Sequence, residues 1–293
     1  MDWQERLNAS IAWIEGHLEG EMEWAAAARE ANCSLFHFLR MFEVVTDCSP
    51  GEYLRRRRLS RAAQELAAGE GKVLDLALKY GYDSPDSFAK AFKRLFGCTP
   101  SEARKPGARL GLYGPLTVSF VLKGLQAMNY RIEERPAFSL TGTWIRVTSD
   151  QGENFKTIPA FWEKSMKDGS FSALARAAPA GSGIGVCGVC ADCGTDAAYF
   201  DYLIAIETPA DRALLPPLCK DVAVPAATWG IFESRGPLPK AVQETWKRIF
   251  SEWFPSSGWE CADGPQLEVY GPGDGAREDY YSEIWIPLKK AAR

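Results

Sequence analysis

The sequence predicts a multidomain protein, with an all-α double helix-turn-helix domain followed by an α+β domain of two strand-helix-strand-strand repeats. The chain has 293 residues, a length that suits about two domains. Residues 34–50 and 84–100 agree in register at Ser, Phe, Phe, Cys and Pro, and residues 225–235 resemble residues 136–146. We expect the first domain at residues 1–107, a linker at 108–125 and the second domain at 126–293.

The second copy of the first repeat contains a capped helix. Ser84 at the N-cap, Pro85 at the first helical position and Asp86 beside the helix N-terminus together predict a helix start. Gly97 tolerates the left-handed conformation that ends many helices. Apolar residues between them follow the spacing of a helix with one buried face: Phe88, Ala91, Phe92 and Leu95.

A short helix and a turn precede each capped helix, which is the layout of a helix-turn-helix. In the second copy the short helix lies in residues 73–80 and Gly81 begins the turn. In the first copy it lies in residues 23–30, and Ser34 caps the helix that follows the turn. An amphipathic helix connects the copies through Leu59, Ala62, Ala63 and Leu66.

Two such units on one connector can enter successive major grooves, which lie about 34 Å apart on one face of DNA. The alternative is a plain helical bundle, which does not need the same cap, Phe spacing and Cys-Ser/Thr-Pro ending twice. Charge separates the two copies. Residues 1–50 hold 3 basic and 9 acidic residues, whereas residues 51–112 hold 13 and 7. Because phosphate attraction depends on basic residues, we expect the second copy to dominate DNA affinity.

The second domain alternates between strand and helix patterns after a Gly/Pro-rich stretch at residues 105–115. Its first half contains a strand pair or one long bent strand at 137–147, a helix at 154–167, and strands at 183–190 and 199–207. Its second half repeats this order with residues 225–235, 239–254, 266–270 and 280–288. We expect helices on one side of a sheet and a small-molecule site between the halves.

The last predicted strand places Tyr281, Glu283 and Trp285 on one face, because side chains alternate along a strand. A carboxylate between two aromatic rings suits an organic cation, which gains both charge pairing and ring contacts. The alternative is a glutamate on a solvated strand face whose aromatic neighbours only cover an edge.

Three cysteines follow one another at CxxC spacing: Cys187, Cys190 and Cys193. This spacing suits zinc, but a closed structural site needs four ligands. Both histidines, His17 and His37, belong to the first domain. We therefore predict no metal and no cofactor, and interpret these cysteines as buried or incidental thiols, with metal binding or redox sensing as the alternative.

No apolar run approaches the ~20 residues that span a bilayer, and the first residues lack the features of a secretory signal. Eight scattered cysteines fit a reducing compartment. These observations predict a cytoplasmic, nucleoid-associated protein with no membrane partner.

Residues 53–66 and 73–104 resemble the DNA-binding domain of AraC/XylS-type transcription regulators. The resemblance implies that residues 34–45 and 84–96 are the groove-reading helices. It implies DNA contacts from Phe36, His37, Arg40, Asp86, Ser87, Lys90 and Arg94. His37 as an ordinary surface histidine and Phe36 as a packing residue are the alternatives. Asp47 departs from the pattern, because the family usually has glycine there, as at Gly97.

Residues 157–164, 199–207, 225–260 and 280–288 resemble the GyrI-like effector-binding domain. The resemblance implies a central pocket in which Glu283 contacts a cationic or amphipathic ligand. The aromatic residues that it implies for the lining are Tyr281, Trp285, Trp229, Tyr270, Trp162 and Tyr202, each with a plain core position as the alternative. For Glu268, on the neighbouring strand, we expect a surface role.

Both resemblances together imply a one-component transcription regulator rather than an enzyme. Its expected partners are double-stranded promoter DNA, a small cationic organic effector and RNA polymerase. The alternative function is a small-molecule hydrolase in which Glu283 serves as the general base.

Overall fold

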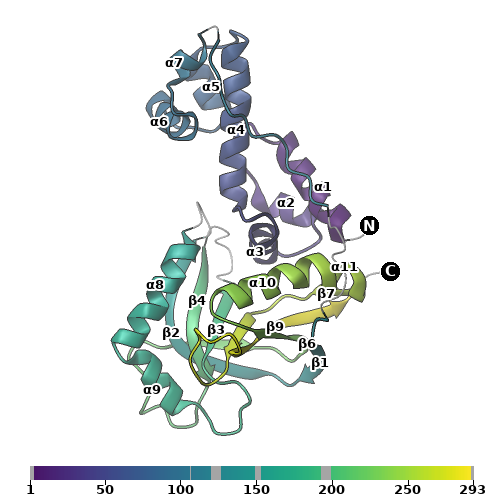
Figure 1. Ribbon diagram of the computed structural model, residues 1–293, viewed down its shortest axis with the longest axis vertical. Coiled ribbons are helices and arrows are strands. Elements are labelled where there is room, and N and C mark those ends of the chain that lie inside the picture. Colours follow the sequence, from purple (N-terminus) through teal and green to yellow (C-terminus); the bar gives the residue numbers. More distant parts are fainter. Residues whose placement is uncertain (1–2, 106, 120–126, 149–152, 193–198, 292–293) are drawn as a thin grey trace. The chain divides into compact units, whose positions relative to one another are not determined.

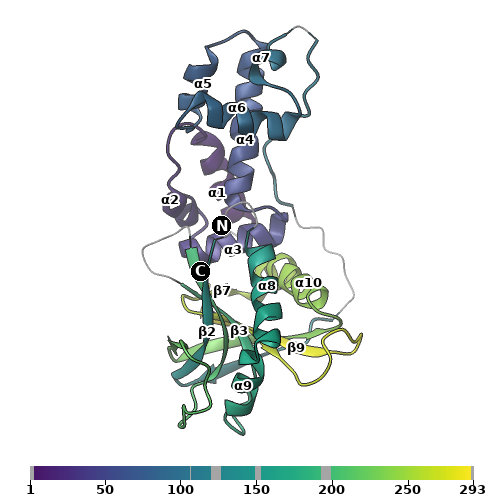
Figure 2. The same cartoon turned by 90° about the vertical axis from the view of Figure 1, so that its left-hand side faces the viewer.

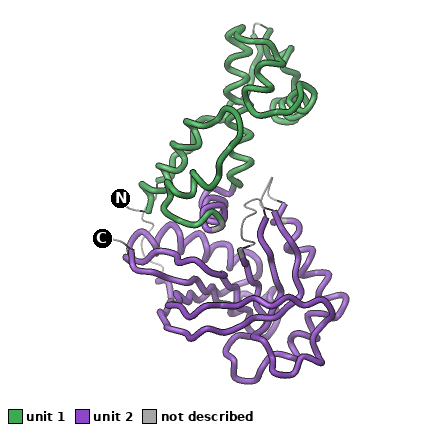
Figure 3. The backbone as a smooth tube through the Cα atoms, turned by 180° about the vertical axis from the view of Figure 1, so that it is seen from behind, with its two compact units in different colours: residues 1–35, 48–119 green, residues 36–47, 120–293 purple. Residues whose placement is uncertain are grey.

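The described part of the chain divides into two units (Figure 3). The computed structural model describes residues 3–105, 107–119, 127–148, 153–192 and 199–291. Unit 1 comprises residues 1–35 and 48–119, and unit 2 comprises residues 36–47 and 120–293. A short helical segment from the first half of the chain therefore groups with the second half. The predicted domain boundaries did not include this exchange.

Unit 1 is helical, as the sequence predicts. Its helices are α1 (Trp3–Gly16), α2 (Trp24–Glu30), α4 (Pro50–Ala67), α5 (Val73–Lys79), α6 (Pro85–Phe96) and α7 (Pro100–Ala103) (Figure 1). The side chain of Ser84 accepts a hydrogen bond from the backbone N–H of Ser87 at 3.2 Å and caps α6. Gly97 ends α6 in the left-handed region with φ 76°. The predicted start and end of this helix are both confirmed.

The core of unit 1 surrounds the apolar face of α6. Phe88 and Phe92 are fully buried and pack with residues of α4 and α5. The four apolar residues predicted for the connecting helix, Leu59, Ala62, Ala63 and Leu66, all lie in this core. Burial of this stripe explains why α4, α5 and α6 form one packed body.

Residues 107–119 form an extended segment that lies along unit 1. Tyr113 N–H donates to the Ser60 hydroxyl at 3.0 Å, and Asn8 exchanges two hydrogen bonds with the backbone of Val118. Arg57 donates to the carbonyl of Tyr113. The described part of the predicted linker is therefore attached to α1 and α4 rather than free, and residues 120–126 lie outside the described residues.

Unit 2 contains helix α3 (Leu35–Thr46), except for its first residue, and the described residues of this unit form a nine-stranded sheet with its own helices. The first repeat consists of β2 (Phe138–Thr148), α8 (Asn154–Lys167), α9 (Ser170–Ala177), β3 (Cys187–Asp192) and β4 (Tyr199–Glu207). The second consists of β6 (Ala227–Arg235), α10 (Lys240–Arg248), the π-helix η2 (Ile249–Trp253), α11 (Phe254–Ser257), β8 (Gln266–Tyr270) and β9 (Tyr281–Lys290). The remaining strands are β1 (Tyr130–Arg135), β5 (Lys220–Val224) and β7 (Trp259–Cys261).

The strand order is β1-β6-β9-β8-β3-β4-β2-β5, with β7 paired to β9. All of these pairs are antiparallel. In this order the two strand-helix-strand-strand repeats meet where β8 pairs with β3. The predicted fold of two repeats is confirmed. The stretch at 137–147, predicted as a strand pair or one long bent strand, forms the single long strand β2, which begins one residue later, at Phe138.

The two faces of the sheet have different cores. Helices α8 and α9 pack on the face that carries Cys190, Tyr202 and Ile204. The opposite face carries a core cluster of strand residues with Ile184 just before β3. The ring centroids of Phe138 in β2 and Trp229 in β6 lie 6.2 Å apart, although these strands are near opposite ends of the strand order, so the sheet curves around this second core. Among the described residues, no helix has the length and apolar character of a membrane span.

Candidate functional site

Two carboxylates of adjacent strands, Glu268 and Glu283, point to opposite faces of the sheet. The register of β8 and β9 pairs Val269 with Glu283 and pairs Glu268 with Ile284. Paired residues share a face, and neighbours along a strand alternate. Glu268 therefore lies on the helix-covered face, while Glu283 lies on the face of the strand core.

Glu283 is surrounded by donors from its own side of the sheet. Arg131 of β1 donates from Nη1 at 2.7 Å and from Nη2 at 3.3 Å. The hydroxyl of Tyr281 donates at 2.6 Å and Trp285 Nε1 at 2.7 Å. Burial alone raises the pKa of Glu283, but these three donors hold the pKa below its usual value. Glu283 is an ionised carboxylate whose charge Arg131 already neutralises.

The aromatic neighbours of Glu283 belong to the core. Trp229 and Trp285 are 1% and 0% exposed, and their ring centroids lie 6.0 Å apart. The guanidinium of Arg135 lies 4.3 Å from the ring centroid of Trp285. For these two tryptophans the structure favours the core alternative that the sequence left open, because protein side chains occupy their surroundings.

Glu268 lies in a second set of aromatic residues, on the helix-covered face. Trp246 Nε1 of α10 and the Tyr270 hydroxyl each donate to its carboxylate at 2.8 Å. Trp162 of α8 donates from Nε1 to the Tyr202 hydroxyl at 2.8 Å, and its ring centroid lies 5.1 Å from that of Tyr270. We call these five residues the Glu268 cluster.

The Glu268 cluster joins both repeats of unit 2, and it overturns the expected surface role of Glu268. The side chain of Glu268 is 18% exposed and is held by donors on α10 and β8. The sequence did contain a signal. In "QLEVY" a carboxylate and an aromatic residue two positions apart share a strand face, as they do in "YYSEIW". The tryptophan on α10 was not predicted as part of a site.

The tyrosines of the cluster are neutral, and Tyr270 donates to Glu268 while Tyr202 accepts from Trp162. Burial raises the pKa of Tyr202 and of Tyr270 well above the usual value, and the nearby Glu268 carboxylate raises both further. A hydroxyl that keeps its proton can donate to a carboxylate. The cluster thus contains one carboxylate among neutral aromatic side chains, which suits a delocalised organic cation, and the guanidinium of Arg40 pairs with this carboxylate at 3.1 Å.

Gly188 of β3 leaves room for the Tyr202 hydroxyl, because a Cβ at this position would lie 2.3 Å from that oxygen. We expect Gly188→Ala to displace Tyr202 and to lower the free energy of unfolding by about 1–2 kcal/mol through overpacking. Gly185→Ala is the matched control, since its Cβ would come no closer than 3.5 Å to the nearest atom. Chemical denaturation of the two variants measures the difference, and equal stabilities would contradict the role assigned to Gly188.

The predicted DNA contacts on α3 are not all exposed. His37 is 6% exposed, its ring centroid lies 5.6 Å from that of Phe250, and burial lowers its pKa to about 3. The side chain of Arg40 is 15% exposed, and its Nη2 donates to Glu268 Oε1 at 3.1 Å. The expectation of an exposed face is therefore wrong for these two residues, because other elements of unit 2 cover them. The side chain of Phe36 lies outside the described residues.

The predicted DNA contacts on α6 are all exposed. Asp86, Ser87, Lys90 and Arg94 lie on the face of the helix away from the buried residues Phe88 and Phe92. Asp86, Lys90 and Arg94 follow one another at intervals of four residues, which places them along one side of the helix. This helix presents a solvent-accessible polar face of the kind that a major groove can take up.

The cysteine spacing does not form a chelating pair. Cys187 and Cys190 lie on opposite faces of β3, in the two different core clusters. Burial raises the pKa of the Cys187 thiol to about 12 and that of Cys190 to about 11. Cys193 lies outside the described residues, and among those that are described no group of residues could hold a metal ion.

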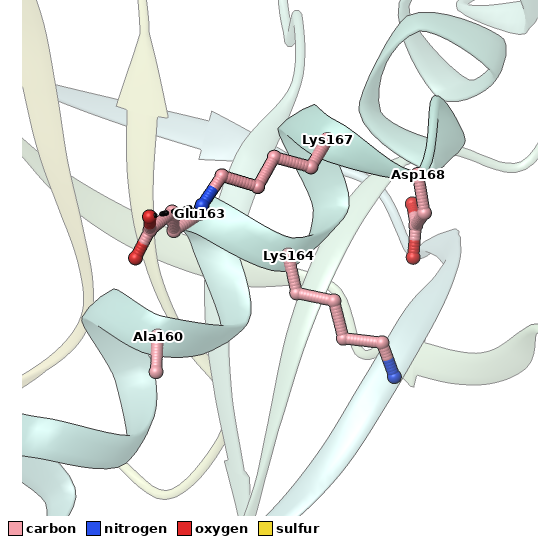
Figure 4. Close-up of a pocket in the computed structure, with 5 residues that line it drawn as sticks. All are labelled: Ala160, Glu163, Lys164, Lys167 and Asp168. Carbon is pink, nitrogen blue, oxygen red and sulfur yellow. Dashed lines mark hydrogen bonds and ion pairs between the residues drawn. The ribbon is translucent and has the colours of Figure 1, made fainter.

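A depression of about 370 Å³ lies on the outer side of α8 (Figure 4). It is lined by Ala160, Glu163, Lys164, Lys167 and Asp168. Lys167 donates to Glu163 at 2.5 Å, and both side chains are mostly exposed. This depression is lined mostly by charged side chains and includes no residue of the Glu268 cluster.

Two family profiles match the chain. The profile described as integron-associated effector binding protein (Cass2) matches residues 131–288. The profile of a helix-turn-helix domain matches residues 27–106. The first of these regions contains the whole Glu268 cluster, and the second contains α3 and α6.

The curated relatives match between about a third and a half of the chain. The HTH-type transcriptional activator AarP of Providencia stuartii is 41% identical over 95 residues, which are 32% of this chain and 70% of AarP. The transcriptional regulator Rob of Salmonella typhimurium is 33% identical over 147 residues, which are 49% of this chain and 50% of Rob. Among solved structures, SAV2435 bound to tetraphenylphosphonium is 22% identical with a TM-score of 0.49, over 55% of this chain and 94% of SAV2435.

Proposed function

Because the chain belongs to the family of integron-associated effector-binding proteins and has an AraC-type DNA-binding domain before the matched region, we propose that it couples promoter recognition to the binding of a small organic cation. The chain is a transcription regulator with a DNA-binding and an effector-binding domain. The proposal adds two helix-turn-helix units that read DNA, the charge of the effector and the residues that bind it.

The exposed face of α6 supports its role in DNA reading. Lys90 and Arg94 are cations that can reach guanine edges or phosphates, and Asp86 and Ser87 lie at the helix end that enters the groove. Helix α3 is the counterpart in the first repeat, and Arg40 occupies the position equivalent to Lys90. Two such helices would read successive major grooves from one chain.

Lys90→Ala is expected to weaken binding to a duplex selected in vitro by about 1 kcal/mol, the lower end of the range for a base or phosphate contact. Lys105→Ala is the matched control, because it removes the same charge from unit 1 outside α6. Fluorescence anisotropy of the labelled duplex measures both affinities. If both substitutions weaken binding equally, Lys90 acts through net charge alone and α6 does not read the duplex.

The Glu268 cluster supports the proposed effector site. The observation that carries the proposal is the carboxylate of Glu268 among the rings of Trp246, Tyr270, Trp162 and Tyr202. A cation gains from the charge and from the ring faces, whereas a neutral ligand leaves the carboxylate without a new partner. Both carboxylates have an arginine partner, but Arg131 binds Glu283 through two nitrogens whereas Arg40 binds Glu268 through one, so Glu283 has weaker support for this role.

Titration with phenylguanidine and with phenylurea tests this proposal. The two compounds have nearly the same shape, but phenylguanidine carries a delocalised positive charge and phenylurea is neutral. We expect saturable calorimetric binding of phenylguanidine to the full chain and weaker binding of phenylurea. Equal affinities for the two compounds would contradict a cation site.

The hydrolase alternative has less support from the geometry. A general base needs a carboxylate that can take up a proton near the working pH. Burial opposes ionisation of Glu283, but Arg131, Tyr281 and Trp285 keep its pKa below the usual value. Paired in this way, Glu283 is a weak base.

A further inference from the structure

Helix α3 groups with unit 2 and lies beside α10 (Figures 1 and 2). Glu43 Oε2 accepts a hydrogen bond from the Asn154 side chain, at the first turn of α8, at 2.9 Å. Asp47, directly after α3, pairs with Lys247 of α10 at 2.6 Å. Arg40 lies three residues before Glu43 on the same helix and reaches the Glu268 cluster.

Arg40 makes the contacts that a cationic ligand of the cluster would make. Its Nη2 lies 3.1 Å from Glu268 Oε1, and its guanidinium carbon lies 4.2 Å from the ring centroid of Trp246. The guanidinium therefore combines an ion pair with a stacked aromatic contact. The chain itself supplies the cation that the site would otherwise take from solution.

Where α3 packs against the rest of unit 2, some buried polar atoms make no hydrogen bond within the described residues. Four buried polar atoms at this contact have no hydrogen-bond partner among the described residues: Arg40 Nη1, Glu43 Oε1, Asn154 Oδ1 and Gln266 Oε1. A buried polar atom without a partner costs about 1–3 kcal/mol. Solvent would satisfy all four atoms if the contact opened, so a modest competing interaction can displace it.

We propose that Arg40 is a built-in occupant of the Glu268 cluster, which a flat cation of the guanidinium or amidinium class displaces. The inference rests on the function proposed above. Arg40 and His37 lie on the α3 face that is expected to read bases, and this face cannot contact unit 2 and DNA at once. Displacement of Arg40 by the effector therefore frees the first groove-reading helix, and the ligand favours the DNA-binding form.

The geometry of Arg40 defines the class of ligand. A planar group with delocalised charge stacks on Trp246 while its N–H groups face Glu268, whereas a compact ammonium ion lacks the stacking surface. An attached ring would extend toward Tyr270 and Trp162, whose rings meet at 83°. Aromatic guanidines and amidines meet both requirements.

Phenylguanidine binding to the full chain tests the inference through Arg40→Ala and Arg40→Gln. Because the occupant lowers the fraction of binding-competent protein, both variants are expected to bind about tenfold more tightly than the unaltered chain. Arg40→Gln keeps more of the aliphatic part of the arginine side chain than Arg40→Ala does. Agreement between the two variants would therefore show that the effect does not come from lost packing. Arg29→Ala, which removes an exposed arginine from α2, should leave the affinity unchanged.

The outcomes separate the inference from the proposed function. If the Arg40 variants bind phenylguanidine no more tightly than the unaltered chain, the inference fails while the cation site stands. If neither they nor the unaltered chain bind phenylguanidine in preference to phenylurea, the proposed site fails and the inference with it. Saturating phenylguanidine should also tighten binding of the unaltered chain to its selected duplex, by the same factor by which the duplex tightens binding of phenylguanidine. An unchanged duplex affinity would overturn the coupling.

Discussion

Replacing Glu268 with glutamine is expected to weaken phenylguanidine binding by about 30-fold, because a hydrogen-bonded ion pair is exchanged for a neutral contact worth about 2 kcal/mol less. The measurement belongs in the Arg40→Gln background, where the internal guanidinium no longer competes. Trp246 and Tyr270 donate to different oxygens of Glu268, so the amide oxygen of glutamine can accept from Trp246 while its amide nitrogen donates to the Tyr270 hydroxyl oxygen. The substitution therefore changes charge with little change of shape, and calorimetry gives the affinity directly.

Glu283→Gln is the control for this experiment. Its side chain lies on the opposite face of the sheet and is bound by Arg131, so phenylguanidine affinity should stay within about twofold of the parent. Phenylurea affinity should be insensitive to both substitutions. If Glu283→Gln weakens phenylguanidine binding and Glu268→Gln does not, Glu283 rather than Glu268 is the carboxylate that binds the ligand.

Replacing Arg131 with methionine is expected to lower the free energy of unfolding of unit 2 by about 2 kcal/mol. The substitution leaves Glu283 buried and ionised without its cation, which costs 3–5 kcal/mol or so for a fully buried pair and less here because Arg131 is partly exposed. Urea denaturation followed by tryptophan fluorescence reports mainly on unit 2, where most tryptophans lie. Arg176→Met on α9 should change stability by less than about 0.5 kcal/mol.

The loss caused by Arg131→Met depends on pH. In the unaltered chain the folded pKa of Glu283 lies below its usual 4.5, so its contribution is present above that pH and disappears as the pH falls through the folded pKa. In the variant, burial raises this pKa, and protonation relieves the unpaired charge. The stability difference should therefore begin to shrink as the pH falls through the raised pKa of the variant, above 4.5, and continue to shrink until Glu283 of the unaltered chain is protonated below pH 4.5. The double variant Arg131→Met/Glu283→Gln should recover most of the loss. A difference that stays constant with pH would contradict the ion pair as its cause.

The sequence by itself determined the local structure and the order of elements. The cap at Ser84, the stop at Gly97 and the apolar stripe of Phe88 and Phe92 are short-range features, and each lies where the pattern predicted it. Asp47 also has a left-handed backbone, with φ 53°, at the position equivalent to Gly97. These features follow from backbone sterics and helical periodicity, which involve residues close in sequence.

Only the tertiary structure decided which side chains meet. Alternation along β8 and β9 was readable, but the register that separates Glu268 from Glu283 is a property of strand pairing. The partner of Glu283 comes from β1, and the partner of Glu268 comes from α3, more than two hundred residues away. Such contacts depend on how distant elements pack together, and the sequence pattern within one element does not show which other element it will meet. For this reason Arg40, predicted as an exposed DNA contact, lies against a carboxylate predicted for the surface.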